Sequence, residues 1–361
     1  MADPRDVARL RLIRTSGVGP VTYRQLIGRF GSADAAIEAL PMLARRGGGA
    51  APTIASERAV LNEIAAIERL GAAHLFLGDP GYPALLAELD SAPPVLSYRG
   101  DIGLAAKLAV AMVGARNASA AACRFARGLA QTLGDAGVVV VSGLARGIDT
   151  QAHVASLASG TIGVIASGID IGFPPENRAL QEEVATRGLL LAEQPPGEEP
   201  RARNFPSRNR IIAGMAIGTV VVEAAPKSGS LITARLAAEA GREVMAVPGS
   251  PLDPRAQGCN LLIREGATLV QSAEDVLEAI RPIDARVVRA PTMPFGGPPP
   301  DDASDADRRR IVDLLGPVPV GVDELIRQSG CAPAAVQMVL LELELAGRLE
   351  RHAGGRVAYF A

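Results

Sequence analysis

Seven short apolar runs recur between residues 101 and 281, separated by stretches with helical spacing. The runs are KLAVAMVG, GVVVVSG, TIGVIASG, GLLLAE, GTVVVEA, REVMAVPG and ATLV. Strands that are apolar throughout, rather than alternately apolar and polar, are typical of a parallel sheet covered by helices on both faces. The pattern therefore predicts a doubly wound, Rossmann-like α/β domain, whose ligands bind beyond the carboxyl ends of the strands.

Two smaller regions flank the predicted sheet. Apolar residues at helical spacing on both sides of the turn SGVGP predict a helical N-terminal domain, which contains either a DNA-binding helix-hairpin-helix or a plain core-forming helix pair. Three helical stretches and a hairpin around Gly354 and Gly355 predict a C-terminal winged helix. The expected divisions are 1–75 for the N-terminal helical domain, 76–100 for an irregular connecting segment, 101–281 for the Rossmann-like domain, 282–304 for a proline-rich linker and 305–361 for the winged helix.

Composition restricts the class of protein. Hydrophobic residues make up 48% of the chain and charged residues 21%, which is ample for a large core. The net charge of −2 means that any nucleic acid must bind at a local patch. No apolar run is long enough to cross a bilayer and the start of the chain lacks a signal-peptide core, so we expect a cytoplasmic protein without membrane contact. The few cysteines and histidines are scattered, and neither a disulfide nor a metal site is predicted.

Three strand-to-helix junctions, VGARNASAA, NFPSRNR and VVEAAPKSGSLITAR, share a composition suited to phosphate. Each combines free backbone N–H groups, a hydroxyl or amide side chain and a cation, which together bind phosphate oxygens. Because three such junctions lie along one sheet edge, the sequence predicts a site for several phosphates in a row, as in a nucleic-acid backbone. The residues that this argument selects are Gly114, Arg116, Arg208, Arg210, Lys227, Ser228, Gly229 and Ser230.

The second junction carries two arginines where a helix is predicted to begin. Pro206 and the expected N-cap Ser207 place Arg208 and Arg210 in the first turn, where the helix dipole repels each cation by a few tenths of a kcal/mol. A bound anion would turn this repulsion into attraction. The alternative is that the two arginines pair with acids elsewhere in the protein.

Enzymatic alternatives have weaker support. The chain has no GxxxxGK[ST] and no GxGxxG at the first junction, so nucleotide hydrolysis, a nicotinamide and a flavin are not expected, and no cofactor is predicted. Asp149 and His153 are four residues apart and could form an acid/base couple, but a structural pair, with Asp149 capping a helix and His153 holding a loop, is favoured. Gly143 and Gly147 permit a turn whose amides support the anion site, and no catalytic residue is predicted.

The expected recognition helix of the winged helix is APAAVQMVLLELELAG. It carries Glu342 and Glu344 and no Lys or Arg, so insertion into a DNA groove would bring carboxylates toward phosphates. Duplex reading is therefore disfavoured, and a protein-binding, regulatory or purely structural role remains.

The motifs SGLARGIDTQAH, SGIDIGFPPEN, NFPSRNRIIAG, VVEAAPKSGSLITA and VPGSPLDPRAQGCNLLIREGA together resemble, in order, those of the DNA-processing protein A (DprA/Smf) family. The resemblance covers about residues 101–281, and many members carry an N-terminal helical domain similar to a sterile-alpha-motif or hairpin fold and a C-terminal winged helix. It implies a non-enzymatic cytoplasmic protein that binds single-stranded DNA, loads the RecA recombinase on it during natural transformation, and forms a homodimer through the α/β domain. Transferred by motif, the DNA pocket comprises Arg116, Phe205, Arg208, Asn209, Arg210, Lys227, Ser228, Gly229 and Ser230.

A few positions depart from the family pattern, among them Ala115, Phe173 and Met215-Ala216, and none of these changes removes a charge. The α/β core also resembles the lysine-decarboxylase-like nucleoside monophosphate phosphoribohydrolases, which are enzymes, but their PGGxGTxxE signature is absent. Release of free base from a nucleotide would distinguish that alternative. A transcriptional regulator that uses the winged helix is a third reading, which the acidic helix disfavours.

Overall fold

The computed structural model describes residues 3–286, 302–352 and 354–360, and the chain divides into two compact units. One unit is Asn62–Ala290, which contains the large sheet. The other unit combines Met1–Leu61 with Pro291–Ala361, so the two ends of the chain belong to one body. No helix within the described ranges is both long and apolar enough to cross a membrane.

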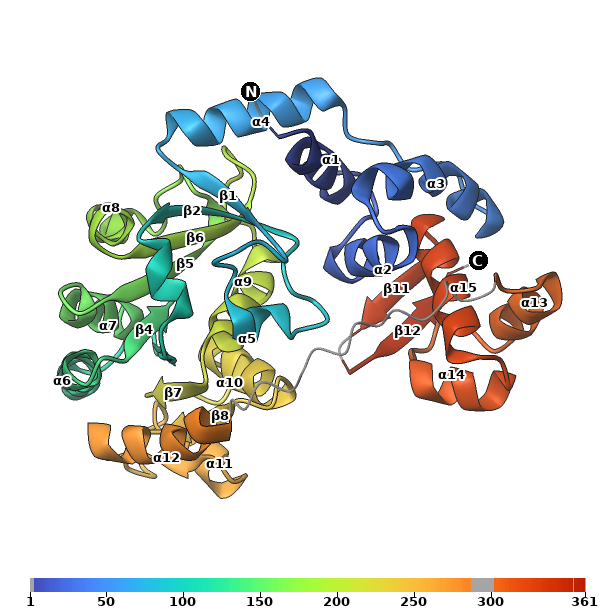
Figure 1. The fold of residues 1–361 in the computed structure, drawn as a ribbon. Coiled ribbons are helices and arrows are strands. Elements are labelled where there is room, and N and C mark those ends of the chain that lie inside the picture. The colour runs from blue at the N-terminus through green and yellow to red at the C-terminus, as the bar shows by residue number, and fades with distance from the viewer. Residues whose placement is uncertain (1–2, 287–301, 353, 361) are drawn as a thin grey trace. The chain divides into compact units, whose positions relative to one another are not determined.

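The large sheet has nine strands in the order β1-β2-β6-β5-β4-β3-β7-β8-β9. Figure 1 labels β1, β2, β6, β5, β4, β7 and β8 of this sheet. The strands are β1 Ala73–Phe76, β2 Val95–Gly100, β3 Ala109–Gly114, β4 Val139–Ser142, β5 Thr161–Gly168, β6 Leu189–Gln194, β7 Gly218–Val222, β8 Glu243–Ala246 and β9 Thr268–Leu269. β3 to β9 pair in parallel and correspond to the seven apolar runs, so the predicted doubly wound sheet is confirmed. The stretch 76–100 is not irregular, because β2 within it adds antiparallel to β6 and β1 pairs with β2.

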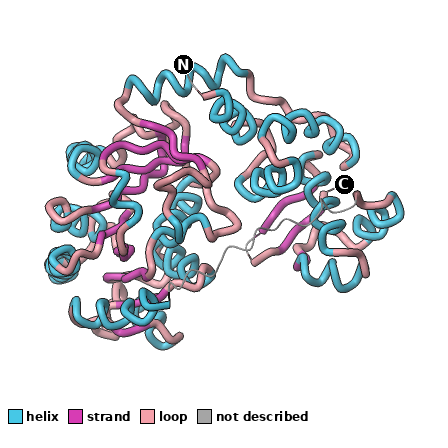
Figure 2. Tube along the Cα trace, in the orientation of Figure 1, coloured by secondary structure: helices cyan, strands magenta, loops and turns pink. Residues whose placement is uncertain are grey.

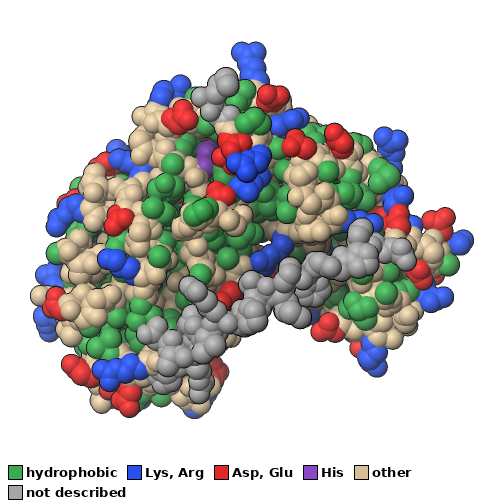
Figure 3. Space-filling model, viewed as in Figure 1, with side chains coloured by type: hydrophobic (Ala, Val, Ile, Leu, Met, Phe, Trp, Pro, Cys, Tyr) green, Lys and Arg blue, Asp and Glu red, His purple; other side chains and the backbone are tan. Residues whose placement is uncertain are grey.

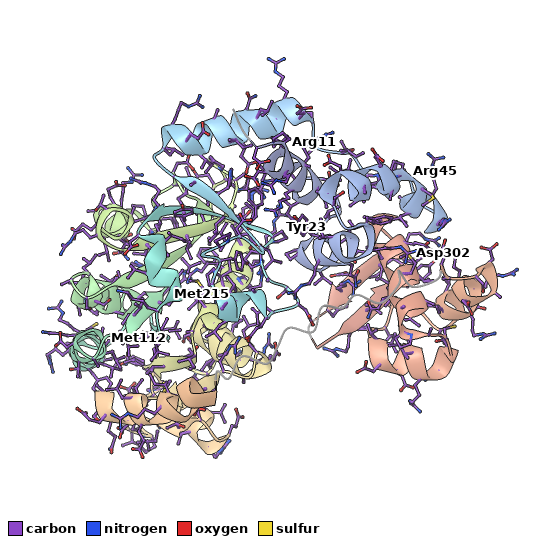
Figure 4. The ribbon with its side chains drawn as sticks, viewed as in Figure 1. Arg11, Tyr23, Arg45, Met112, Met215 and Asp302 are labelled. Atoms are coloured by element: carbon purple, nitrogen blue, oxygen red, sulfur yellow. The ribbon has the colours of Figure 1, made fainter. Side chains whose placement is uncertain are left out.

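Helices cover both faces of the sheet, as the cyan tubes beside the magenta strands show in Figure 2. They are α4 Glu57–Arg69, α5 Ala84–Ala87, α6 Ala120–Asp135, α7 Ile148–Ser156, α8 Arg178–Arg187, α9 Asn204–Met215, α10 Gly229–Glu239, α11 Gln257–Arg264 and α12 Ala273–Arg286, with single 3₁₀ turns at Ile102–Ala106 and Pro175–Asn177. Alternate side chains of β3 enter opposite cores: Val110 and Met112 pack with α6 and α7, whereas Ala111 packs with Ile211 of α9. In Figure 4, Met112 and Met215 accordingly lie in different layers.

The order of the strands fixes where a ligand can bind. From β3 the chain adds β4, β5 and β6 on one side and then returns through α9 to place β7 on the other side of β3. The loops that leave the carboxyl ends of β3 and β7 therefore diverge and leave a crevice between them, which is the usual ligand position in sheets of this type.

The second unit combines the N-terminal helices with a winged helix. Its helices are α1 Pro4–Ile13, α2 Pro20–Phe30, α3 Ala33–Arg46, α13 Asp305–Asp313, α14 Val322–Ser329 and α15 Pro333–Leu345, and its three-stranded sheet has the order β10 Val320–Gly321, β12 Arg356–Tyr359, β11 Leu349–His352. Three helices and the β11–β12 hairpin confirm the predicted winged-helix plan. Most of the predicted linker 282–304 lies outside the described residues, and α12 extends to Arg286.

Candidate functional site

Acidic and basic side chains are mixed over the surface shown in Figure 3. This mixture agrees with the net charge of −2 and gives the protein no general attraction for polyanions. A site for an anionic ligand therefore has to be local, and the crevice at the carboxyl ends of β3 and β7 is the place to look for it.

A groove of about 700 Å³ occupies that crevice. All the residues predicted from the sequence to bind DNA or phosphate, except Arg210, line it. These are Gly114, Arg116, Phe205, Arg208, Asn209, Lys227, Ser228, Gly229 and Ser230, and Asp149 of the supporting loop joins them. The groove thus brings together the three junctions, which lie up to 116 residues apart in the sequence as numbered from Gly114 to Ser230.

Two of the junctions are tied to each other by Glu223, the residue that follows β7. Glu223 has a φ of 58°, which is rare for a residue with a side chain, and its carbonyl accepts a hydrogen bond from the N–H of Ala115 at 2.8 Å. Its carboxylate accepts hydrogen bonds from the backbone N–H and the hydroxyl of Ser119, the N-cap of α6. On the other side of the groove, Ser228 caps α10 through the N–H of Ser230. The loops after β3 and β7 are therefore held in one arrangement, and the N-terminus of α10 lies beside the groove.

Arg208 is buried at the floor of the groove, with only 7% of its surface exposed. Its helix begins at Asn204 rather than at Ser207, so Arg208 lies in the second turn and the predicted repulsion by the first turn does not arise. Burial lowers the pKa of Arg208 to about 10, and the carboxylate of Asp149 opposes that shift. The side chain therefore stays charged at neutral pH. Its Nε has no hydrogen-bond partner within the described part of the chain, which leaves a buried donor without an acceptor.

Asp149, in the first turn of α7, supports this arrangement by binding the loop after β4. Its Oδ2 accepts hydrogen bonds from the backbone N–H groups of Gly143 and Ala145, each at 3.2 Å, and burial raises its pKa. The expected N-cap role is wrong, because Gly147 occupies that position and Asp149 lies one residue inside α7. Gly147 has a φ of 77° and packs so closely that a Cβ there would lie 2.2 Å from the carbonyl oxygen of Ala115.

His153 does not form an acid/base couple with Asp149. It is fully buried, its Nδ1 lies 2.8 Å from the hydroxyl of Thr161, and burial lowers its pKa to about 3. The favoured structural reading of the pair is consistent with these contacts, although His153 fastens α7 to the first residue of β5 rather than to a loop.

Arg210 points away from the groove. Its guanidinium hydrogen-bonds to the carbonyl of Ser91 and pairs with the carboxylate of Glu193, and only 13% of its side chain is exposed. For Arg210, the structure therefore shows the alternative of Sequence analysis, in which an arginine of NFPSRNR pairs with an acid elsewhere in the protein. Arg208 and Arg210 therefore have different environments despite being two residues apart.

A second pocket of about 240 Å³ continues the groove, and the two share Arg116, Ala145, Phe205 and Arg208. Phe173 and Phe205 form a ring pair in this pocket with centroids 6.1 Å apart. The Arg116 guanidinium lies 5.4 Å from the centroid of the Phe205 ring, within cation–π range. The pocket therefore combines aromatic faces with cations.

Sequence reasoning missed several lining residues. Phe173 and Arg146 line the second pocket, and Arg255 lines the groove. Phe173 follows β5, Arg146 follows β4 and Arg255 follows β8, so each lies beyond the carboxyl end of a parallel strand. That position could have identified them from the sequence, although none lies in one of the three phosphate-type junctions. Within the described ranges, no group of three or more His, Cys, Asp or Glu residues could hold a metal ion.

Comparison with known proteins places this geometry in context. A family model described as DNA recombination-mediator protein A matches residues 73–281, a DprA-like N-terminal helix-hairpin-helix model matches residues 3–66, and a DprA winged-helix model matches residues 296–355. Protein Smf of Synechocystis sp. is 33% identical over 99% of both chains. The DNA processing protein DprA of Streptococcus pneumoniae is 47% identical over 55% of this chain and 71% of its own.

Two solved structures share the fold. The X-ray structure of DprA from Streptococcus pneumoniae has a TM-score of 0.58 and 42% identity, and covers 62% of this chain and 78% of that chain. DNA processing protein A from Helicobacter pylori has a TM-score of 0.53 and 27% identity, and covers 59% of this chain and 96% of its own. The structure of the Helicobacter protein is described as giving its single-stranded DNA binding mode.

Proposed function

Because this chain belongs to the DNA recombination-mediator protein A (DprA/Smf) family, we propose that its groove beyond β3 and β7 binds the backbone of single-stranded DNA. The groove carries the cations Arg116, Arg208 and Lys227, and the N-terminus of α10, where Ser228, Gly229 and Ser230 line it, adds backbone N–H groups. A phosphate oxygen placed against Arg208 would supply an acceptor to a buried donor that otherwise has none.

The observation that carries the choice of a single strand is the continuity of the groove with the aromatic pocket. Phe173 and Phe205 offer ring faces within reach of a backbone held by Arg116 and Arg208. A base of a single strand is free to stack on such a ring, whereas the bases of a duplex are stacked on each other. Backbone contacts and ring stacking both work with any base, so we propose binding with little sequence preference.

We further propose that the protein acts by binding and does not perform catalysis. Asp149 and His153, the pair that could have served as acid and base, are committed to separate internal hydrogen bonds. The phosphoribohydrolase alternative gains no support from these contacts. Loading of the RecA recombinase, assembly into a homodimer through the α/β domain, and a place in the cytoplasm are parts of the same proposal that rest on the family resemblance.

The test is a binding titration with single-stranded and duplex DNA of equal length across a range of salt concentrations. Single strands should bind more tightly, and the slope of log affinity against log salt should be about −0.7 per phosphate contacted. Equal affinity for both forms at every salt concentration would reject the single-strand proposal. The rate of RecA assembly on single strands, with and without this protein, tests the loading step separately, because an unchanged rate would remove that step and leave DNA binding standing.

A further inference from the structure

Helix α15 of the winged helix is buried on two sides. Val336, Val339, Leu340 and Leu343 belong to the core of the winged helix itself, together with Ile311 and Leu325 of the two other helices. Met338, Leu341 and Leu345 belong instead to the core of the N-terminal helical region. A helix with apolar residues on two faces needs a cover on each of them, and the winged helix covers only one.

The other cover is the N-terminal helical region, Pro4–Arg46, of the same chain. α3 contacts α15, and Leu40 and Leu43 of α3 lie in the same apolar cluster as Leu341 and Leu345. Figure 1 shows α15 next to α2 and α3. The side of α15 that would face a DNA groove in a DNA-reading winged helix is not free in this unit.

Gly47 shows how closely the two parts approach. A Cβ at this position would lie 2.0 Å from the carbonyl oxygen of Glu342, a distance that no real side chain tolerates. The backbone of Gly47 has a φ of −72° and a ψ of −2°, which any residue adopts. The turn itself therefore does not require glycine here, and what excludes a side chain is the backbone of α15.

A polar rim surrounds the apolar contact. Glu342 is 1% exposed, pairs with Arg308 at 2.9 Å and lies 3.9 Å from Arg46, so the acid of the helix is neutralised internally. The Gln25 amide donates a hydrogen bond to Gln337 at 3.0 Å. Asp302, labelled in Figure 4, pairs with Arg46 and Arg308. An apolar centre with a hydrogen-bonded and charged rim is the anatomy of a specific protein–protein contact.

We propose that the winged helix is a protein-docking module whose partner is the N-terminal helical region of its own chain. α15 serves as the docking helix, with Met338, Leu341 and Leu345 as its apolar contacts and Gln337 and Glu342 at its rim. The module joins the two ends of the chain into one body and leaves no helix face for a DNA groove. The docking surface is remote in sequence from the groove residues, so docking does not depend on whether the groove binds DNA.

The test uses the full-length chain with Gln25→Cys and Gln337→Cys, treated with a short bis-maleimide and mapped by mass spectrometry. The two side chains lie within hydrogen-bond distance, so a link between positions 25 and 337 should form within one chain. The two variants that carry only one of these substitutions control for reaction at the native Cys123, which is partly exposed. A link that forms only between two chains, or does not form, would overturn docking within the chain.

A wedge variant makes the test specific. In the chain with both cysteine substitutions, Gly47→Leu should lower the yield of the link by about tenfold or more. Weakening the contact between α15 and the N-terminal helices by about 1.4 kcal/mol already shifts its equilibrium tenfold. Gly28→Leu is the matched control, because nothing lies within 4 Å of a Cβ at position 28 and the yield should be unchanged. Arg46→Glu, which places like charges beside Asp302 and Glu342, gives a second way to open the contact if the wedge unfolds the unit. If a folded wedge variant and Arg46→Glu both link as well as the parent, the proposal is wrong.

Discussion

The guanidinium of Arg208 lies directly over the backbone of Gly143, so that a Cβ at position 143 would be 1.6 Å from Nη1. The two residues come from the second turn of α9 and the end of β4, and their contact places the only buried arginine among the described residues at the floor of the groove. Gly143 has no unusual φ, so the contact alone requires glycine.

Gly143→Ala therefore tests the position of the cation. The added methyl group meets the end of a flexible side chain, so the fold should survive while the guanidinium moves out of its place. We expect the affinity for single strands to fall by about tenfold, equivalent to about 1.4 kcal/mol, with a thermal midpoint close to that of the parent. Gly128→Ala in α6, where a Cβ meets nothing within 4 Å, is the control. Unaltered affinity of a folded Gly143→Ala protein would mean that Arg208 does not hold the ligand.

Single substitutions should separate Arg208 from Arg210. Arg210→Ala removes the partner of Glu193, a carboxylate with 17% of its side chain exposed, so we expect a loss of about 1–3 kcal/mol in the free energy of unfolding. The affinity of the folded fraction for DNA should stay the same. Arg208→Ala should instead weaken binding to every DNA sequence similarly. Denaturant unfolding and DNA titration on both proteins decide the matter, and a large loss of affinity in Arg210→Ala would contradict the structure.

Lys227 provides a test at the far side of the groove. If it neutralises one phosphate, Lys227→Ala should reduce the slope of log affinity against log salt by about 0.7 for single strands. Arg235→Ala is the matched control, because Arg235 is a largely exposed residue of α10 that pairs with Glu239 and does not line the groove. The slope for Lys227→Ala should be shallower than the slope for Arg235→Ala. Equal slopes for the two variants would remove Lys227 from the phosphate contacts.

The parallel sheet was predictable because each of its strands is apolar throughout, and the groove was predictable because its loops follow those strands. Other features lacked a local signal. α9 begins at Asn204, and its N-cap residue Arg203 makes no side-chain cap. Because Ser207 is the stronger N-cap residue by type, it predicted the wrong start for the helix. β2 lies in a segment interrupted by Gly and Pro, and only its pairing with β6 makes it a strand.

The different environments of Arg208 and Arg210 also depend on contacts with residues far away in the sequence. The partners of Arg210, Ser91 and Glu193, lie 119 and 17 residues away in the sequence, and nothing in the motif NFPSRNR distinguishes it from Arg208. The same holds for α15. Its apolar residues occur on more than one face of the helix, but which part of the chain covers the second face follows only from the fold.

His153 should make stability depend on pH. Its pKa is about 3 in the folded protein against 6.5 in an ordinary environment, so the unfolded chain binds the proton first as the pH falls. This contribution to stability is complete above pH 6.5 and decreases from there toward pH 3, by about 1.4 kcal/mol per pH unit. His153→Gln, which cannot titrate, should have a slope smaller by that amount between about pH 4 and 6. Urea unfolding at several pH values measures both slopes, and identical slopes would mean that His153 is exposed to protons in the folded state.

Removal of residues 305–361 tests what the winged helix does for the rest of the chain. From the acidic residues of α15 alone, this truncation is expected to leave DNA binding largely intact, and the groove residues, all between 113 and 255, support the same expectation. The truncation also removes the contact between α15 and α3, which stabilises the N-terminal helices. Loss of Met338, Leu341 and Leu345 exposes the apolar face formed by Leu40 and Leu43, and each lost core side chain is worth about 1.5–3 kcal/mol. We therefore expect the truncated protein to bind single strands with unchanged affinity per folded molecule but to self-associate and to melt its N-terminal region at lower temperature. Light scattering and thermal melting, compared with the protein that has residues 305–361, check this. A truncated chain with the same oligomeric state and the same melting profile would show that α3 does not need its cover.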